Sequence, residues 1–111
     1  MYNVAMEIAL KEGEVLEELF QDKKIIQNVN LYRFTSDSVL LSKFVKGKKG
    51  DVVADFCAGS GIVGLHFLCL NPHISSVVLY EMQPALSDMS ARTIAFDGFE
   101  KARAVCARVQ D

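Results

Sequence analysis

The sequence predicts an α/β fold in which three parallel strands alternate with helices, and three observations support this. Apolar runs of strand length occur at residues 51–56, 76–80 and 103–109. The first two runs are each followed by apolar residues at helical spacing, at residues 62–70 and 84–96. A glycine turn, Gly59-Ser-Gly61, joins the first strand to its helix. Because strands that alternate with helices form parallel sheets with right-handed crossovers, the sheet is expected to be parallel.

Residues 1–34 are expected to form an N-terminal extension of helices and a hairpin, within a single domain that spans residues 1–111. Apolar residues at near-helical intervals predict one broken or two short amphipathic helices before residue 20, interrupted at Gly13. Residues 24–27 and 31–34 then predict a small hairpin. After the extension, Ser36 is expected to cap a further helix, whose apolar positions are Val39, Leu40, Phe44 and Val45.

Both helices of the sheet region end at clear stop signals. Asn71-Pro72 follows the helix predicted at 62–70, and a proline cannot continue a helix. Gly98 follows the helix predicted at 84–96, where glycine is the usual terminating residue. The sequence contains no internal repeat or linker that would divide it.

Acidic residues at the ends of the first two strands indicate a cofactor at the glycine turn. Gly59, Gly61 and Gly64 allow the backbone to pass close to a ligand. Glu81 ends the second strand, where its carboxylate can accept hydrogen bonds from ribose hydroxyls. Asp55 ends the first strand, and its charge would repel a bound diphosphate. S-adenosylmethionine carries an ammonium and a sulfonium and has no phosphate, so these acids favour it as the cofactor.

Two other interpretations of the turn stay open. The glycine spacing also fits a dinucleotide site, in which a helix N-terminus faces a pyrophosphate. Alternatively, the turn binds no ligand, with Asp55 acting as a cap and Glu81 as an ordinary strand end. Ser60 belongs to the candidate site as part of the turn, but the glycine spacing does not fit a hydrolase nucleophile.

Four segments of the chain match a known family in order and approximate spacing. They are Lys24-Ile-Ile-Gln27, Phe34-Thr-Ser-Asp37-Ser-Val-Leu-Leu41, Asp55-Phe-Cys-Ala-Gly-Ser-Gly61-Ile and Tyr80-Glu-Met-Gln83. From about Gly13 onward, the chain resembles the N-terminal half of the bacterial tRNA(Val) adenine N6-methyltransferases. The glycine segment is general to class I methyltransferases, whereas the first two segments are narrower. The resemblance implies a Rossmann-like class I methyltransferase fold, truncated to its first three parallel strands and their flanking helices.

The same resemblance implies roles for individual residues in holding S-adenosylmethionine. Asp55, Gly59 and Gly61 would line the methionine part of this methyl donor. Glu81 would contact its ribose, and Met82 would lie at the edge of the adenine.

Two further acids are assigned to the site by the resemblance. Asp37 would lie close to the same pocket, and Asp111 would contact the adenine amino group, although a terminal residue is expected to fray. In the family's strand order the strand at 51–56 would lie at the edge of this half-sheet. Its apolar residues suit a central strand, so the chain is expected to self-associate through this edge.

The activity implied by the resemblance is transfer of a methyl group to the exocyclic N6 amine of an adenine in tRNA. The family carries an Asn-Pro-Pro-Tyr type of motif that holds the target amine, and this sequence has none, since its only Asn-Pro is followed by His73. The chain alone is therefore expected to bind the donor without transferring its methyl group. The alternative is a non-catalytic module that binds the donor, its product or a partner chain.

Composition adds limits on location and partners. The net charge is −2, which gives no basic surface for nucleic acid, so the tRNA-binding surface is expected outside this sequence. Three cysteines without Cys-x-x-Cys spacing indicate free thiols in a reducing, cytoplasmic compartment. His66, Cys69 and His73 share helical offsets, but the proline break before His73 argues against a metal site. No segment has the length of a membrane span, so no membrane contact is expected.

Overall fold

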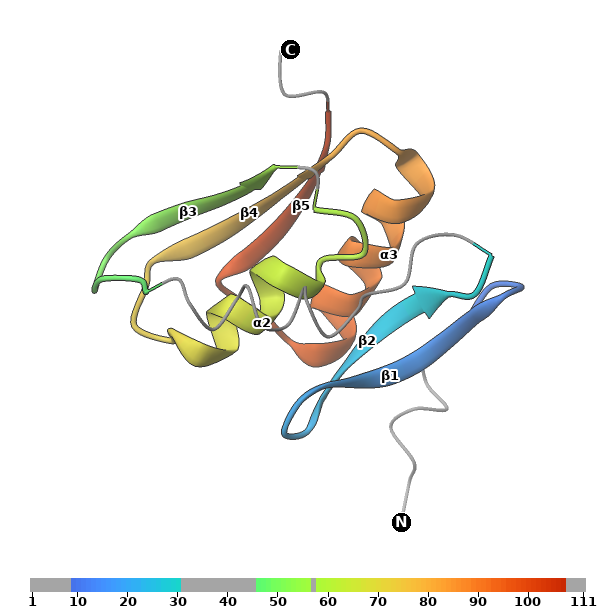
Figure 1. Cartoon of the computed structure of the whole chain (residues 1–111), viewed down its shortest axis with the longest axis horizontal. Coiled ribbons are helices and arrows are strands. Elements are labelled where there is room, and N and C mark those ends of the chain that lie inside the picture. Colours follow the sequence, from blue (N-terminus) through green and yellow to red (C-terminus); the bar gives the residue numbers. More distant parts are fainter. Residues whose placement is uncertain (1–8, 31–45, 57, 108–111) are drawn as a thin grey trace.

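The computed structural model describes residues 9–30, 46–56 and 58–107. Within them, a three-stranded parallel sheet has the order β3-β4-β5, with β3 at Val52–Phe56, β4 at Ser76–Glu81 and β5 at Ala102–Cys106. Two helices connect these strands, α2 at Ile62–Leu70 and α3 at Pro84–Asp97. The predicted alternation of strands and helices is confirmed, and so is the position of the first parallel strand at the edge of the sheet (Figure 1).

The helices begin and end where local sequence dictates. Gly61 precedes α2 with a φ of 98°, a left-handed conformation that glycine adopts without strain. α2 ends at Leu70, directly before Asn71-Pro72. α3 has Pro84 in its first turn, where the missing N–H is not needed, and Gly98 terminates it at φ 70°.

Both helices cover the same face of the sheet, as right-handed crossovers in one direction require. Val77 and Leu79 of β4 are fully buried against this helical layer. On the opposite face Val52 and Phe56 are 71% and 55% exposed, and Phe56 stacks on Tyr80 at 5.4 Å between ring centroids. None of the described helices covers that face.

The N-terminal region differs from the sequence prediction. Residues 14–20 were predicted as helix, but Glu14–Phe20 is a strand, β1, paired antiparallel with β2 at Lys23–Asn28. The prediction of helix is wrong because a short apolar run fits both helix and strand spacing, and pairing with β2 decides the outcome. Residues 24–27 pair with β1, and their predicted pairing with residues 31–34 stays a prediction. Residues 31–34, and the helix expected after Ser36, lie outside the described residues.

The β1–β2 hairpin packs against the helices on their side away from the sheet (Figure 1). Ile25 joins the main core, and Ile26 packs with Leu86 and Met89 of α3. The backbone N–H of Ile26 also donates to the Thr93 hydroxyl at 3.0 Å. The hairpin therefore adds a third layer over the helices.

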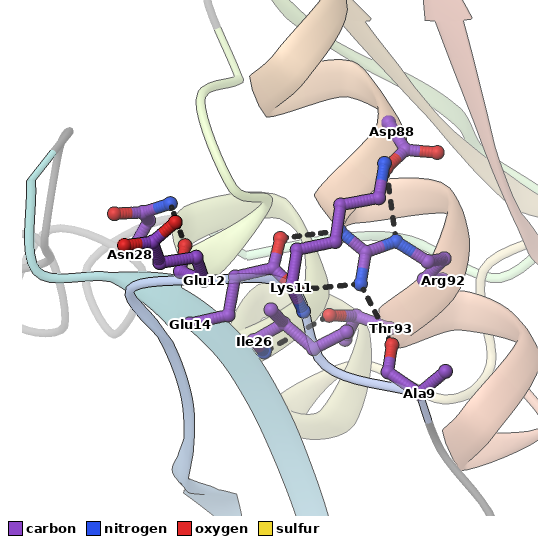
Figure 2. A network of polar contacts seen from close by, with 9 residues as sticks. All are labelled: Ala9, Lys11, Glu12, Glu14, Ile26, Asn28, Asp88, Arg92 and Thr93. Atoms are coloured by element: carbon purple, nitrogen blue, oxygen red, sulfur yellow. Dashed lines mark hydrogen bonds and ion pairs between the residues drawn. The ribbon is translucent and has the colours of Figure 1, made fainter.

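An ion-pair network fastens the hairpin to α3 (Figure 2). The Arg92 guanidinium donates to both carboxylate oxygens of Glu14 on β1 and, through Nε, to Asp88 at 2.9 Å. Lys11 pairs with the same Asp88 oxygen at 3.0 Å. The Glu14 side chain is only 3% exposed, and the hydrogen bonds from Arg92 hold the pKa of this carboxyl below its usual range. A bidentate arginine–carboxylate pair fixes orientation as well as distance.

Candidate cofactor site

The glycine turn lies between β3 and α2 at the carboxyl end of the parallel strands. Gly59 has a φ of 61° and Gly61 a φ of 98°, both in the left-handed region. The N–H of Gly61 donates to the carbonyl of Ala58 at 2.9 Å, which closes the turn. In α/β sheets this end of the strands is where ligands bind.

Glu81, the last residue of β4, fixes the turn to the next strand. Its Oε1 accepts from the N–H of Gly59 at 2.8 Å, and its Oε2 accepts from the N–H of Gln83 at 2.9 Å. The residue is 7% exposed. Each carboxylate oxygen has a second lone pair, so Glu81 can still accept hydrogen bonds from a ligand.

Asp55 is held by the first turn of α2. Its Oδ2 accepts from the N–H of Gly64 at 3.1 Å. A Cβ on Gly64 would lie 2.4 Å from Cδ2 of Leu79 and 3.0 Å from Oδ2 of Asp55, so only glycine permits this approach of helix to strand. Burial raises the pKa of the Asp55 carboxyl, the bond from Gly64 opposes that rise, and the neighbouring charge of Glu81 adds to it. A positive charge beside Asp55 would therefore stabilise its ionised form.

A cavity of about 280 Å³ lies beside these groups. It is lined by Asp55, Ala58, Gly59, Ile62, Val63, Glu81, Gln83 and Leu86. The lining has two carboxylates, and none of these residues is a lysine, arginine or histidine. A cation fits such a cavity, because it would relieve the repulsion between the two acids, whereas a phosphate would add to it.

The structure brings together part of the residue set that the sequence indicated. Asp55, Gly59 and Glu81 line the cavity. Gly61 and Ser60 belong to the turn but do not line the cavity, and Ser60 is fully buried.

The other candidate residues lie away from the cavity lining or cannot be located. Met82 follows Glu81 but is 59% exposed and does not line the cavity, so its contact with adenine stays a prediction. Asp37 and Asp111 lie outside the described residues, and their roles also stay predictions.

Two residues that support the turn were not assigned a role from the sequence. Gln27 of β2 accepts from the Ser60 hydroxyl at 3.0 Å, and Ser90 of α3 donates to the carbonyl of Gly59 at 2.9 Å. Gln27 was visible only as part of the segment Lys24-Ile-Ile-Gln27. Ser90 gave no local signal, because its contact depends on how α3 packs beside the turn.

A cavity of about 510 Å³ beside Glu14 and Asp88 also has an acidic lining, but there Lys11 supplies a positive charge. A cavity of about 400 Å³ at the opposite end of the strands contains none of the candidate residues. Cys69 lines it, and burial raises the pKa of that thiol to about 11, which makes it a poor nucleophile. Among the described residues no cluster of three or more His, Cys, Asp or Glu side chains could hold a metal ion. No helix in the described part of the chain has the length and apolar character needed to cross a membrane.

Known structures with a similar fold include several methyltransferases. TYW2 of P. horikoshii, solved in complex with MeSAdo, matches with a TM-score of 0.73 and 17% identity over 91% of this chain and 38% of its own. A SAM-dependent methyltransferase from Agrobacterium tumefaciens gives 0.67 and 11% over 93% and 34%. Trm5 of Methanocaldococcus jannaschii, in complex with adenosine, gives 0.63 and 12% over 91% and 31%. No protein-family model and no curated protein matches the sequence.

These similarities show the fold. The chain has the Rossmann-like α/β fold of class I methyltransferases, and it spans about a third of the length of the three structures. The parallel order β3-β4-β5 and the cavity at the carboxyl end of β3 and β4 agree with this class of fold.

Proposed function

We propose that this chain is the donor-binding part of an S-adenosylmethionine-dependent methyltransferase. The observation that carries the proposal is the cavity beside the glycine turn, where Asp55 and Glu81 supply two carboxylates and none of the described lining residues supplies a positive charge. A dinucleotide would bring its pyrophosphate to these carboxylates, which Coulomb repulsion opposes. S-adenosylmethionine would instead bring an ammonium and a sulfonium.

Each lining group has a defined task in this proposal. Asp55 attracts the cationic methionine end of the donor, and burial together with the charge of Glu81 raises the pKa of its carboxyl. Glu81 accepts hydrogen bonds from the ribose hydroxyls. The glycine turn, with Gly59 in a left-handed conformation, allows the backbone to approach the ligand closely. When bound, the donor supplies an activated methyl group on its sulfonium.

The acceptor is proposed from the resemblance of the upstream segments. Lys24-Ile-Ile-Gln27 and the segment around Asp37 favour an enzyme that methylates the exocyclic N6 amine of an adenine in tRNA. Two similar structures are, by their own descriptions, an RNA methyltransferase from Pyrococcus horikoshii, described as putative, and a tRNA m1G37 methyltransferase, which supports RNA as the substrate class. The second candidate is a non-catalytic donor-binding module. We place either protein in the cytoplasm.

Calorimetry with the purified chain tests the donor site. S-adenosylmethionine and S-adenosylhomocysteine should bind more tightly than NAD. The variant Glu81→Ala should bind either ligand about 10- to 100-fold more weakly. This loss of affinity corresponds to the usual free energy of hydrogen bonds to a charged group. Because Glu81 also holds Gly59 and Gln83, unfolding is measured in parallel. Glu100→Ala, an exposed acid at the other end of the strands, is the control. Preferential binding of NAD would contradict the proposal.

We also propose that the chain self-associates through β3. This strand pairs only with β4, so one of its edges has backbone groups without a strand partner among the described residues. Its exposed face carries Val52 and Phe56, which are apolar. Light scattering coupled to size exclusion over a dilution series should show dimers or larger species. A monomer at high concentration, with the amides of residues 52–56 in full exchange with solvent, would refute this.

A further inference from the structure

Three side chains hold the glycine turn, and each comes from a different element. Glu81 of β4 accepts from the N–H of Gly59 at 2.8 Å. Ser90 of α3 donates to the carbonyl of the same residue at 2.9 Å. Gln27 of the hairpin accepts from the Ser60 hydroxyl at 3.0 Å. The first two contacts come from the Rossmann-like core, whereas the third ties the turn to the added hairpin.

Burying the Gln27 side chain destabilises the fold at one of its two polar atoms. Gln27 is fully buried, and its Nε2 has no hydrogen-bond partner among the described residues. Its neighbours Ile25 and Ile26 are also fully buried, so an apolar side chain of the same length would suit the position better. An unpaired buried amide destabilises the native state. Packing alone therefore does not account for glutamine here.

We propose that Gln27 is a positioning residue for the cofactor site, acting through Ser60. Ser60 lies between Gly59 and Gly61, which both have positive φ and few steric limits on their conformation. The bond from Ser60 to Gln27 restrains the turn at its middle residue. The hairpin thereby sets the conformation in which the backbone of the turn meets the ligand. This inference rests on the proposed donor site.

The mechanism predicts a loss of affinity without a matching loss of stability. Gln27→Met keeps the length of the side chain but removes both the unpaired N–H group and the acceptor for Ser60. The variant should be about as stable as the parent, because the unpaired N–H group is lost while the buried Ser60 hydroxyl loses its acceptor. The double variant with Ser60→Ala removes both groups and should be as stable as the parent or more stable. Gln27→Met should nevertheless bind S-adenosylhomocysteine about 3- to 10-fold more weakly, since the turn is no longer restrained. A purely structural glutamine would not separate these two quantities.

The experiment compares four variants with the parent by calorimetry, urea unfolding and amide exchange. They are Gln27→Met, Ser60→Ala, the double variant, and Gln21→Met as a control for the same change at the exposed turn of the hairpin. The double variant should bind no more weakly than the weaker single variant, because both substitutions break one contact. Exchange at the amides of Gly59 and Gly61 should be faster in Gln27→Met and unchanged in Gln21→Met.

The outcomes separate this inference from the proposed function. If the parent binds the ligand and Gln27→Met binds it equally well, the inference is overturned and the donor site stands. Loss of stability in Gln27→Met with unchanged exchange at the turn would assign Gln27 to packing, which also overturns it. If the parent binds no donor, the proposed function fails, and a positioning role for Gln27 fails with it.

Discussion

Replacing Gly64 with alanine should damage both the fold and the cofactor site. The new Cβ would lie 2.4 Å from Cδ2 of Leu79, where ordinary contacts begin near 3.4 Å. Leu79 is fully buried, so its displacement strains the core. The same Cβ would lie 3.0 Å from Oδ2 of Asp55, the atom that accepts from the N–H of Gly64. The carboxylate must therefore move with the helix.

The expected magnitude follows from two opposing contributions. Overpacking a buried site costs about 1–3 kcal/mol, whereas alanine in place of glycine stabilises a helix by up to about 1 kcal/mol. Gly64 lies in the first turn of α2, where the helix gain is small. A net loss of about 1–2 kcal/mol in the free energy of unfolding is expected, which corresponds to a fall in Tm of roughly 5–15 °C for a domain of this size.

Urea unfolding followed by circular dichroism measures the change, and calorimetry with S-adenosylhomocysteine measures the site. Leu79→Val supplies the matched background, because it shortens the side chain that the new Cβ meets. Gly64→Ala should cost less in that background than in the parent, as expected for contacting residues. A Gly64→Ala variant as stable as the parent, with equal ligand affinity, would refute the close approach of α2 to β3 and β4.

Two further predictions concern the charged groups. Burial raises the pKa of Asp55, so ionisation of this carboxyl destabilises the folded state as the pH rises above 3.8. Asp55→Asn should therefore stabilise the chain at neutral pH and yet weaken donor binding. Equal donor affinity across a pH titration and in the variant would exclude an ionic role for Asp55. Arg92 lowers the pKa of Glu14, so that pair stabilises the fold above pH 4.5 and its contribution disappears as acid protonates Glu14. Arg92→Met should destabilise the chain by about 2 kcal/mol, because the Glu14 carboxylate loses its guanidinium partner and keeps, among the described residues, only the N–H of Lys11. Adding Glu14→Gln should restore most of this loss, and purely additive losses in chemical denaturation would disprove the coupling.

Local chemistry made the sheet region predictable. The helix at Ile62–Leu70 was placed at its observed bounds, because Gly61 and Asn71-Pro72 are strong start and stop signals. The other strands and α3 differ from prediction by a few residues at their ends, where fraying and pairing determine the boundary. The N-terminal region was mistaken because β1 is stabilised by pairing with β2 and by Arg92, partners that its own sequence does not reveal.

The sequence by itself determined the order of parallel strands and helices, the glycine turn, and the placement of Asp55 and Glu81 at strand ends. These follow from short-range signals: glycine conformation, helix stops and the regular geometry of α/β crossovers. Tertiary structure alone decided that the two acids share one cavity, whose described lining residues include no basic one, and that Gln27 reaches Ser60 across 33 positions of sequence. Such contacts depend on how the hairpin packs on the helices, and side-chain burial in that interface is a property of the assembled layers.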